Sequence, residues 1–132
     1  MTAQIGAVGV LEHIVRPQDL ATAWANDVPV MATPVLLWLA ELACMKAIEG
    51  SVPDGRMTLG VAHEMRHLAP TPEGGLITLQ AELVESDGKL LTFRVRASDG
   101  SETVLEGRHV RGLVARQRFL DRVAAKAAEH AA

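Results

Sequence analysis

A single carboxylate lies inside the most apolar stretch of the chain. Glu41 follows LLWLA and precedes LACM, and no other charged residue occurs between Pro34 and Met45. An ionised carboxylate among apolar side chains is costly unless it is paired or hydrated. A partly desolvated carboxylate can act as a general base, or it can attack a thioester and give an anhydride. The residues leave both roles open, as well as the plainer interpretation that Glu41 faces solvent.

Two histidines form a second candidate group. His63 and His67 lie in a stretch with the pattern of a strand, so both side chains are expected on one face. At that spacing they are too far apart to share a metal ion easily, and we predict no metal site. Imidazole suits acid–base catalysis near neutral pH. For an isolated strand histidine, however, a structural or surface role is the first expectation.

Thr33 precedes Pro34, the usual order of an N-cap and a first helical residue, so Thr33 is predicted to cap a helix. Thr33 and Glu41 would then be separated by about 12 Å along the helix axis and by about 80° in direction. They cannot touch within one straight helix. A site that uses both requires substrate between them, a side chain that reaches back, or a group from a second subunit.

Gly60 and a group of arginines complete the candidates. A strand glycine relieves crowding, or it lets a substrate carbonyl approach a backbone N–H. The arginines gather near the end of an acidic chain, where they form a solvated edge or a contact for phosphate groups. They are Arg108, Arg111, Arg116 and Arg118.

A long helix must position Glu41. It is predicted from Pro34 to just before Gly50, because no breaker interrupts this stretch. It is apolar almost all round, which is typical of a helix buried on most of its circumference. A short helical segment over 19–26, with Asp19 as N-cap, and a terminal helix over about 117–130 are also predicted.

Strands must position the histidines and Gly60. Asp87-Gly88 and Asp99-Gly100 are two-residue hairpin signals, so the strands around them are expected to be antiparallel. The simplest packing is a single α+β domain over 1–132 in which a curved antiparallel sheet wraps one long helix. One helix cannot cover so long a sheet, which favours dimerisation. The strands are predicted over 5–15, 57–69, 76–86, 89–98 and 102–116.

Composition excludes several functional classes. The chain has 13 basic and 16 acidic residues and only 3% aromatic residues, which argues against nucleic-acid binding. The N-terminus lacks a basic region, and the longest apolar stretch contains two prolines, so neither a secretory signal nor a membrane span is expected. The one cysteine, Cys44, suits a reducing compartment. We therefore expect a cytoplasmic location.

Several stretches together resemble the fluoroacetyl-CoA thioesterase family. They are TPVLLWLAELACMKAIEG, LGVAHEMRHLAPTPEGG, LTFRVRASDG and EGRHVRGLV, and the similarity covers roughly residues 5 to 125. The resemblance implies a hot-dog fold, a homodimer with active sites at the subunit interface, and no cofactor apart from the CoA of the substrate. The catalytic threonine, helix glutamate and strand histidine of that family fall on Thr33, Glu41 and His67.

The resemblance also implies substrate-binding residues. The family's glycine near the thioester carbonyl falls on Gly60, and an arginine near the acyl or CoA portion falls on Arg111. Enzymes specialised for fluoroacetate carry aromatic residues on a lid before the helix. Here Trp24 retains one aromatic residue, but Asp27 occupies the other position. We therefore expect a different acyl preference.

The expected function is hydrolysis of a small or medium acyl-CoA to the free acid and CoA. One alternative is a hot-dog hydratase or dehydratase, although the close Asp and His motif of those enzymes is not found. Another is a non-catalytic module that binds an acyl-CoA. The sequence leaves open the acyl group and whether CoA or a carrier protein presents it.

Overall fold

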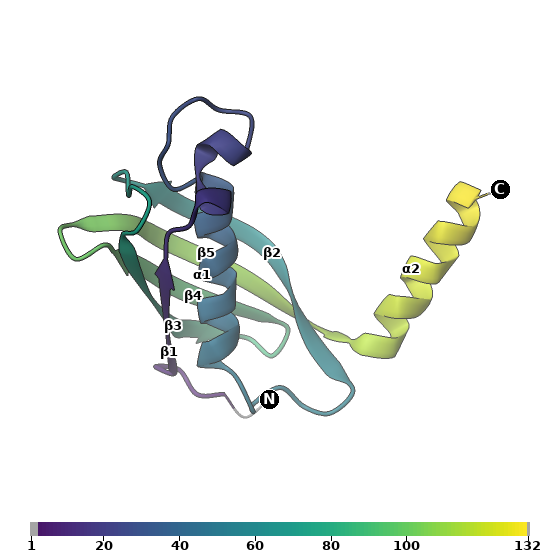
Figure 1. Ribbon diagram of the computed structural model, residues 1–132. Coiled ribbons are helices and arrows are strands. Elements are labelled where there is room, and N and C mark those ends of the chain that lie inside the picture. The colour runs from purple at the N-terminus through teal and green to yellow at the C-terminus, as the bar shows by residue number, and fades with distance from the viewer. Residues whose placement is uncertain (1–2, 132) are drawn as a thin grey trace.

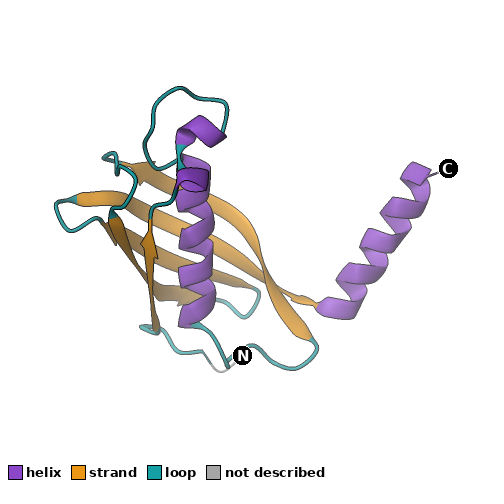
Figure 2. Ribbon diagram, viewed as in Figure 1, coloured by secondary structure: helices purple, strands orange, loops and turns teal. Residues whose placement is uncertain are grey.

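The computed structural model describes residues 3–131 and consists of one antiparallel sheet that wraps a helix (Figure 1). The sheet order is β1-β3-β4-β5-β2, and all neighbouring strands are antiparallel. The helix α1 (Thr33–Ala47) lies against one face of the sheet (Figure 2). This arrangement confirms the predicted α+β hot-dog architecture. The strands are β1 (Val8–Ile14), β2 (Arg56–His67), β3 (Leu76–Ser86), β4 (Leu90–Ser98) and β5 (Thr103–Ala115).

The two predicted hairpins are confirmed, and local hydrogen bonds explain them. Asp87 Oδ1 accepts from the backbone N–H groups of Lys89 and Leu90 at 2.9 and 2.7 Å. Gly88 takes a left-handed φ of +87°, which its missing side chain permits. Asp99 makes the same pair of bonds with Ser101 and Glu102 at 3.0 and 3.1 Å. Each carboxylate therefore fixes the turn between two strands.

Two predicted helix caps are wrong. Ala32, with φ −73° and ψ 136°, is the N-cap of α1, and Thr33 is already helical. The threonine hydroxyl is therefore free to bond elsewhere. Asp19 ends the 3-10 helix η1 (Pro17–Asp19) instead of starting a helix. Its Oδ2 accepts a hydrogen bond from the backbone N–H of Arg16 at 2.9 Å and lies 2.7 Å from His13 Nε2. The carboxylate thus bonds to groups that precede it in the chain, whereas an N-cap side chain bonds to groups that follow it.

Helix α1 packs closely against β1 and β3. Ala40, Ala43 and Cys44 are fully buried, and a Cβ at Gly9 would overlap backbone atoms of Ala43 and Ala47. Glycine thus lets the strand and the helix touch. Burial also raises the pKa of the Cys44 thiol to about 12, so this cysteine is a core residue without a thiolate.

The opposite side of α1 remains open. Trp38 and Met45 are 52% and 44% exposed, and they share a helical stripe with Glu41. The stripe adjoins β2, which is an edge strand of the sheet.

A second helix, α2 (Arg116–Ala131), extends away from the sheet and has no buried residue in its described part (Figure 1). A separate short helix, η2 (Ala21–Ala23), lies in the connection to α1.

Within residues 3–131, neither helix combines the length and the apolar character that crossing a bilayer requires.

Gly9→Ala tests the close contact between β1 and α1. The added methyl group meets backbone atoms that cannot rotate away, so the free energy of unfolding should fall by about 1–3 kcal/mol. Urea denaturation measures this change. The exposed neighbour provides the control, since Val10→Ala should change the free energy of unfolding by about 0.5 kcal/mol or less. Equal stability of wild type and Gly9→Ala would contradict the packing described.

Candidate active site

Glu41 is the centre of a cluster of polar side chains between α1, β2 and β5. Its Oε1 accepts a hydrogen bond from Arg111 Nη1 at 3.2 Å and lies 3.6 Å from His109 Nε2. Its Oε2 lies 3.9 Å from His63 Nε2. The Glu41 side chain is 31% exposed, so the carboxylate is paired but remains in contact with solvent.

Arg111 is buried and held at three points. It is 4% exposed, its Nε donates to Thr58 Oγ1 at 2.9 Å, and its Nη2 donates to the Thr58 carbonyl at 3.0 Å. The third nitrogen, Nη1, reaches both Glu41 and His109. A buried guanidinium requires an anionic partner, and Glu41 supplies it. Arg111 therefore orients the carboxylate.

His109 supports this arrangement as a neutral imidazole. It is fully buried, and its Nδ1 donates to the Ala62 carbonyl at 2.9 Å. Its Nε2 must then accept the hydrogen bond from Arg111 Nη1 at 3.1 Å. Burial, and after it the neighbouring His63, lowers the pKa of His109 to about 4. The His63 ring stacks on His109 with centroids 4.3 Å apart.

A bulge in β2 brings these residues to one face. Gly60 pairs with Arg111, whereas Ala62 pairs with the preceding residue of β5, so Val61 is an extra residue in β2. After the bulge His63 pairs with His109, and His67 is likewise returned to the helix side. In a regular strand without the bulge, Gly60 and His67 would point to opposite faces, because they are seven residues apart.

Gly60 makes room for the carboxylate. A Cβ at this position would overlap Glu41 Oε1 and would also lie 3.5 Å from His109 Cε1. This contact gives a physical reason for the glycine different from the expected approach of a substrate carbonyl. That Gly60 also lets the thioester carbonyl of a substrate approach remains a prediction.

Thr33 and His67 form a separate pair. Thr33 Oγ1 and His67 Nδ1 share a hydrogen bond of 2.7 Å, which joins the start of α1 to the end of β2. Burial lowers the pKa of His67, so the imidazole is neutral at neutral pH. Within residues 3–131, the buried Nε2 of His67 has no hydrogen-bond partner. A buried donor or acceptor without a partner suggests that one comes from outside the chain.

A cavity of about 320 Å³ opens beside the Thr33–His67 pair. Its lining combines aliphatic side chains, among them Val28, Val30 and Met31 from the segment before α1, with the polar groups of Asn26, Thr33 and His67. Trp24, predicted to bind substrate, does not line this cavity, and 53% of its surface is exposed. The predicted residues therefore fall into two groups, with Glu41 in one and Thr33 in the other.

Sequence reasoning missed two members of the Glu41 cluster, Thr58 and His109, and did not assign His63 to it. A usable signal existed for His109, because it alternates with Arg111 along β5 and must share its face. No such signal links His63 to Glu41, because the bulge in β2 decides which face His63 shares with Gly60.

The donor set of the cluster contains candidate metal ligands. One ligand atom from each of Glu41, His63 and His109 lies within 4.8 Å of the others. However, Arg111 Nη1 is within hydrogen-bond distance of both Glu41 and His109. The guanidinium therefore already supplies the positive charge that a metal ion would bring, and these residues fit an internal ion pair better than a metal site.

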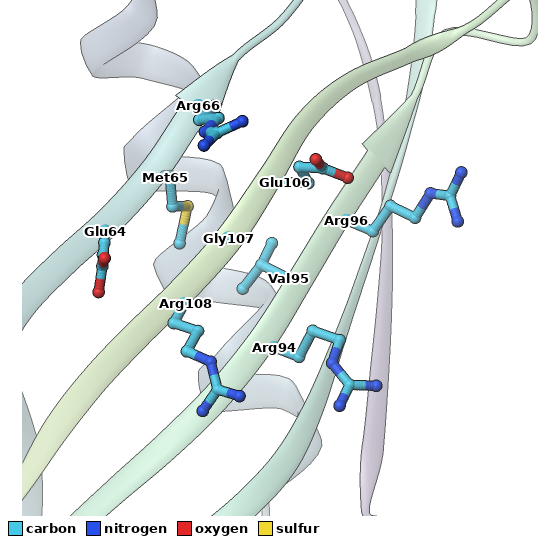
Figure 3. Close-up of a pocket in the computed structure, with 9 residues that line it drawn as sticks. All are labelled: Glu64, Met65, Arg66, Arg94, Val95, Arg96, Glu106, Gly107 and Arg108. Carbon is cyan, nitrogen blue, oxygen red and sulfur yellow. The ribbon is translucent and has the colours of Figure 1, made fainter.

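The other face of the sheet carries a depression of about 500 Å³ with four arginines (Figure 3). Carboxylates neutralise part of this charge: Glu64 lies opposite Arg108, and Glu106 lies opposite both Arg66 and Arg96. Oppositely charged cross-strand pairs stabilise a solvated sheet surface. Helix α1 lies behind the strands in this view, so the sheet separates the depression from Glu41.

Comparisons with known proteins identify close relatives. Residues 15–117 match a family model described as fluoroacetyl-CoA-specific thioesterase. The fluoroacetyl-CoA thioesterase of Streptantibioticus cattleyicolor is 35% identical over 97 residues, which cover 74% of this chain and 70% of that protein.

Solved structures of thioesterases are also similar to this chain. A structure of the fluoroacetyl-CoA thioesterase has a TM-score of 0.87 at 29% identity and covers 93% of this chain and 96% of its own. A Phe-to-Ala mutant of that enzyme, in complex with fluoroacetate and CoA, has a TM-score of 0.81 at 29% identity and covers 88% and 98%. A thioesterase superfamily member from Thermus thermophilus has a TM-score of 0.85 at 25% identity and covers 97% of both chains.

The neutral state of His109 predicts a pH dependence of stability. The unfolded chain takes up a proton near pH 6.5, whereas folded His109 takes it up only near pH 4. The unfolded state therefore binds more protons between these values, and stability falls as the pH falls through this window. Between pH 7 and 4.5, wild type should lose about 2 kcal/mol more than His109→Asn.

Urea denaturation at several pH values measures this difference. His130→Asn, on the exposed helix α2, is the control and should follow the wild-type curve. Parallel curves for wild type and His109→Asn would show that His109 is not held neutral.

Proposed function

We infer that this chain, which belongs to the fluoroacetyl-CoA-specific thioesterase family, hydrolyses the thioester of a small or medium acyl-CoA to the free acid and CoA. The observation that carries this proposal is the state of Glu41. Arg111 holds one of its oxygens, and the other oxygen lies 3.9 Å from His63 Nε2 in a side chain that is 31% exposed. A carboxylate fixed in this way is ready to act on water or on a carbonyl group.

The second group supplies the remaining chemistry. The Thr33–His67 pair adjoins a cavity whose aliphatic side chains suit an acyl chain. We assign the Thr33 hydroxyl to the orientation of substrate. We assign His67, with an unpartnered ring nitrogen, to proton relay: its neutral ring accepts the proton that Glu41 takes from the attacking water and passes it to the departing thiolate. Water activated by Glu41 attacks the carbonyl carbon, and the bond to sulfur then breaks.

The two groups do not meet within one chain. The eight residues from Thr33 to Glu41 correspond to about 12 Å along α1, and Glu41 makes its contacts with His63, His109 and Arg111. A second subunit can bring the groups together, because β2 is an edge strand whose outer hydrogen-bonding groups are open to another strand.

We therefore propose a homodimer in which β2 pairs with its own copy. A twofold axis at Glu64, which would then lie opposite its own copy, would place Gly60 opposite His67 of the partner subunit, on the same face, because Val61 is the extra residue between them. The Glu41 that covers Gly60 would then approach the Thr33–His67 pair across the interface. Such pairing would also cover part of the exposed apolar surface, which includes Trp38 and Val61.

The cavity supports an aliphatic acyl group. Its lining includes aliphatic side chains, and the aromatic Trp24 is absent from it. Fluoroacetyl is smaller and more polar than the chains that such a wall accommodates. We propose that short linear or branched aliphatic acyl-CoAs are better substrates.

Glu41→Gln and His67→Ala test the catalytic assignment. Each variant removes a group that handles a proton, so kcat should fall at least about a hundredfold. Release of free thiol from acyl-CoA substrates, followed with a thiol reagent, provides the measurement. Glu106→Gln and His130→Ala, both remote from the cluster, are the matched controls and should hydrolyse at the wild-type rate.

Near-normal turnover in either active-site variant, with the fold intact by circular dichroism, would overturn the assignment. Wild type that converts acyl-CoA without thiol release would indicate a hydratase. Saturable binding without any reaction would indicate a binding module.

Subunit mixing tests the composite site. Glu41→Gln and His67→Ala proteins are each defective, but a mixed dimer contains one site with both native residues if the site combines two subunits. Mixing the two variants after reversible dissociation should therefore restore a substantial part of the activity. No recovery, with mixed dimers demonstrated by mass spectrometry, would place all catalytic groups in one chain.

A further inference from the structure

Two depressions that share Arg56 lie beside the first residues of β2, and we call the two together the groove. Its first part has a volume of about 240 Å³ and lies between the end of α1 and the start of β2. Met45, Ile48, Val52 and Met57 give it mostly apolar walls. One end is at Thr58, the residue that anchors Arg111. The groove therefore begins beside the candidate active site.

The second part of the groove is basic. Arg56 lines the first part and also a further depression of about 380 Å³, where β5 continues into α2. Arg118, Phe119 and Arg122 of α2 line the same depression. Arg118 and Arg122 lie one helical turn apart and so share a face. We call the group of Arg56, Arg118, Phe119 and Arg122 the α2 root.

The charge of the α2 root is not neutralised locally. Across residues 3–131, no carboxylate lies within 4.0 Å of a guanidinium nitrogen of Arg56, Arg118 or Arg122. The convex face, which is the face of the sheet away from α1 in Figure 3, differs in its layout. Only Arg108 has a carboxylate within 4.0 Å there, but Arg66, Arg96 and Arg108 each have a glutamate opposite them on a neighbouring strand. Three unneutralised guanidiniums beside one aromatic ring stand out in a chain with a net charge of −3.

We propose that the α2 root binds the phosphorylated adenine nucleotide of CoA, and that the apolar part of the groove holds the pantetheine arm. This inference rests on the proposed function. Guanidinium groups bind phosphate oxygens in bidentate fashion, and an aromatic ring such as Phe119 stacks on a base. Arg56 and Gly60 are four residues apart on β2, or about 13 Å, a distance that a long flexible arm spans.

The assignment changes the roles expected for the arginines. Arg111 is buried with Glu41 and has no free nitrogen for a phosphate. Arg108 lies on the other face, 3.8 Å from Glu85. Arg116 donates to Met57 Sδ at 3.5 Å and does not line the depression. Of the cluster seen in the sequence, Arg118 therefore carries the phosphate contact, together with Arg56 and Arg122.

The double variant Arg118→Gln/Arg122→Gln tests the proposal kinetically. We compare kcat/KM for an acyl-CoA with kcat/KM for the same acyl group on pantetheine, which lacks the nucleotide. In the double variant, the ratio of kcat/KM for the acyl-CoA to kcat/KM for the acyl-pantetheine should fall at least about tenfold, mainly because the KM for the acyl-CoA rises. Arg94→Gln/Arg108→Gln, on the convex face, is the control of equal charge change and should keep the wild-type ratio.

A binding experiment separates this proposal from the proposed function. Isothermal titration with adenosine 3′,5′-bisphosphate should show binding to wild type that weakens at high salt and weakens at least about tenfold in the double variant. This result would support the site even if wild type released no thiol. An unchanged kinetic ratio, or nucleotide binding that is absent from wild type or unaltered in the variant, would overturn the proposal.

Discussion

The buried guanidinium of Arg111 is the constraint on which the site depends. A positive charge that is 4% exposed requires hydrogen-bond acceptors and an anion close by. Thr58 provides two acceptors, neutral His109 provides a third, and Glu41 provides the negative charge. One interaction thus explains why a carboxylate lies in an apolar helix and why one of its oxygens is fixed by the guanidinium.

The sheet has irregular features that serve this interaction. The bulge at Val61 turns His63 and His67 toward α1, and Gly60 leaves space for the carboxylate. Gly9 lets α1 lie close to β1, which leaves its opposite stripe open along β2. In the proposed dimer, this open side becomes the place where the Thr33–His67 pair of one subunit meets Glu41 of the other.

Much of the fold was predictable because its signals are local. The helix around Glu41 and the hairpins at Asp87 and Asp99 follow from periodicity and turn residues within short windows. The role of Thr33 was not predictable in this way, because its hydroxyl bonds to a histidine 34 positions later. The direction of His63 depends on a register shift set by β5, which no short window contains. The family resemblance selected Glu41, Thr33 and His67, but not their division into two groups.

The central claim is that the thioester lies between Glu41 of one subunit and the Thr33–His67 pair of the other. A crystal structure with a non-hydrolysable acyl-CoA analogue tests it most directly. The account predicts a dimer joined through β2, with the analogue's carbonyl carbon near Oε2 of Glu41 and near the other subunit's His67. An analogue bound entirely within one chain, away from Glu41, would contradict it.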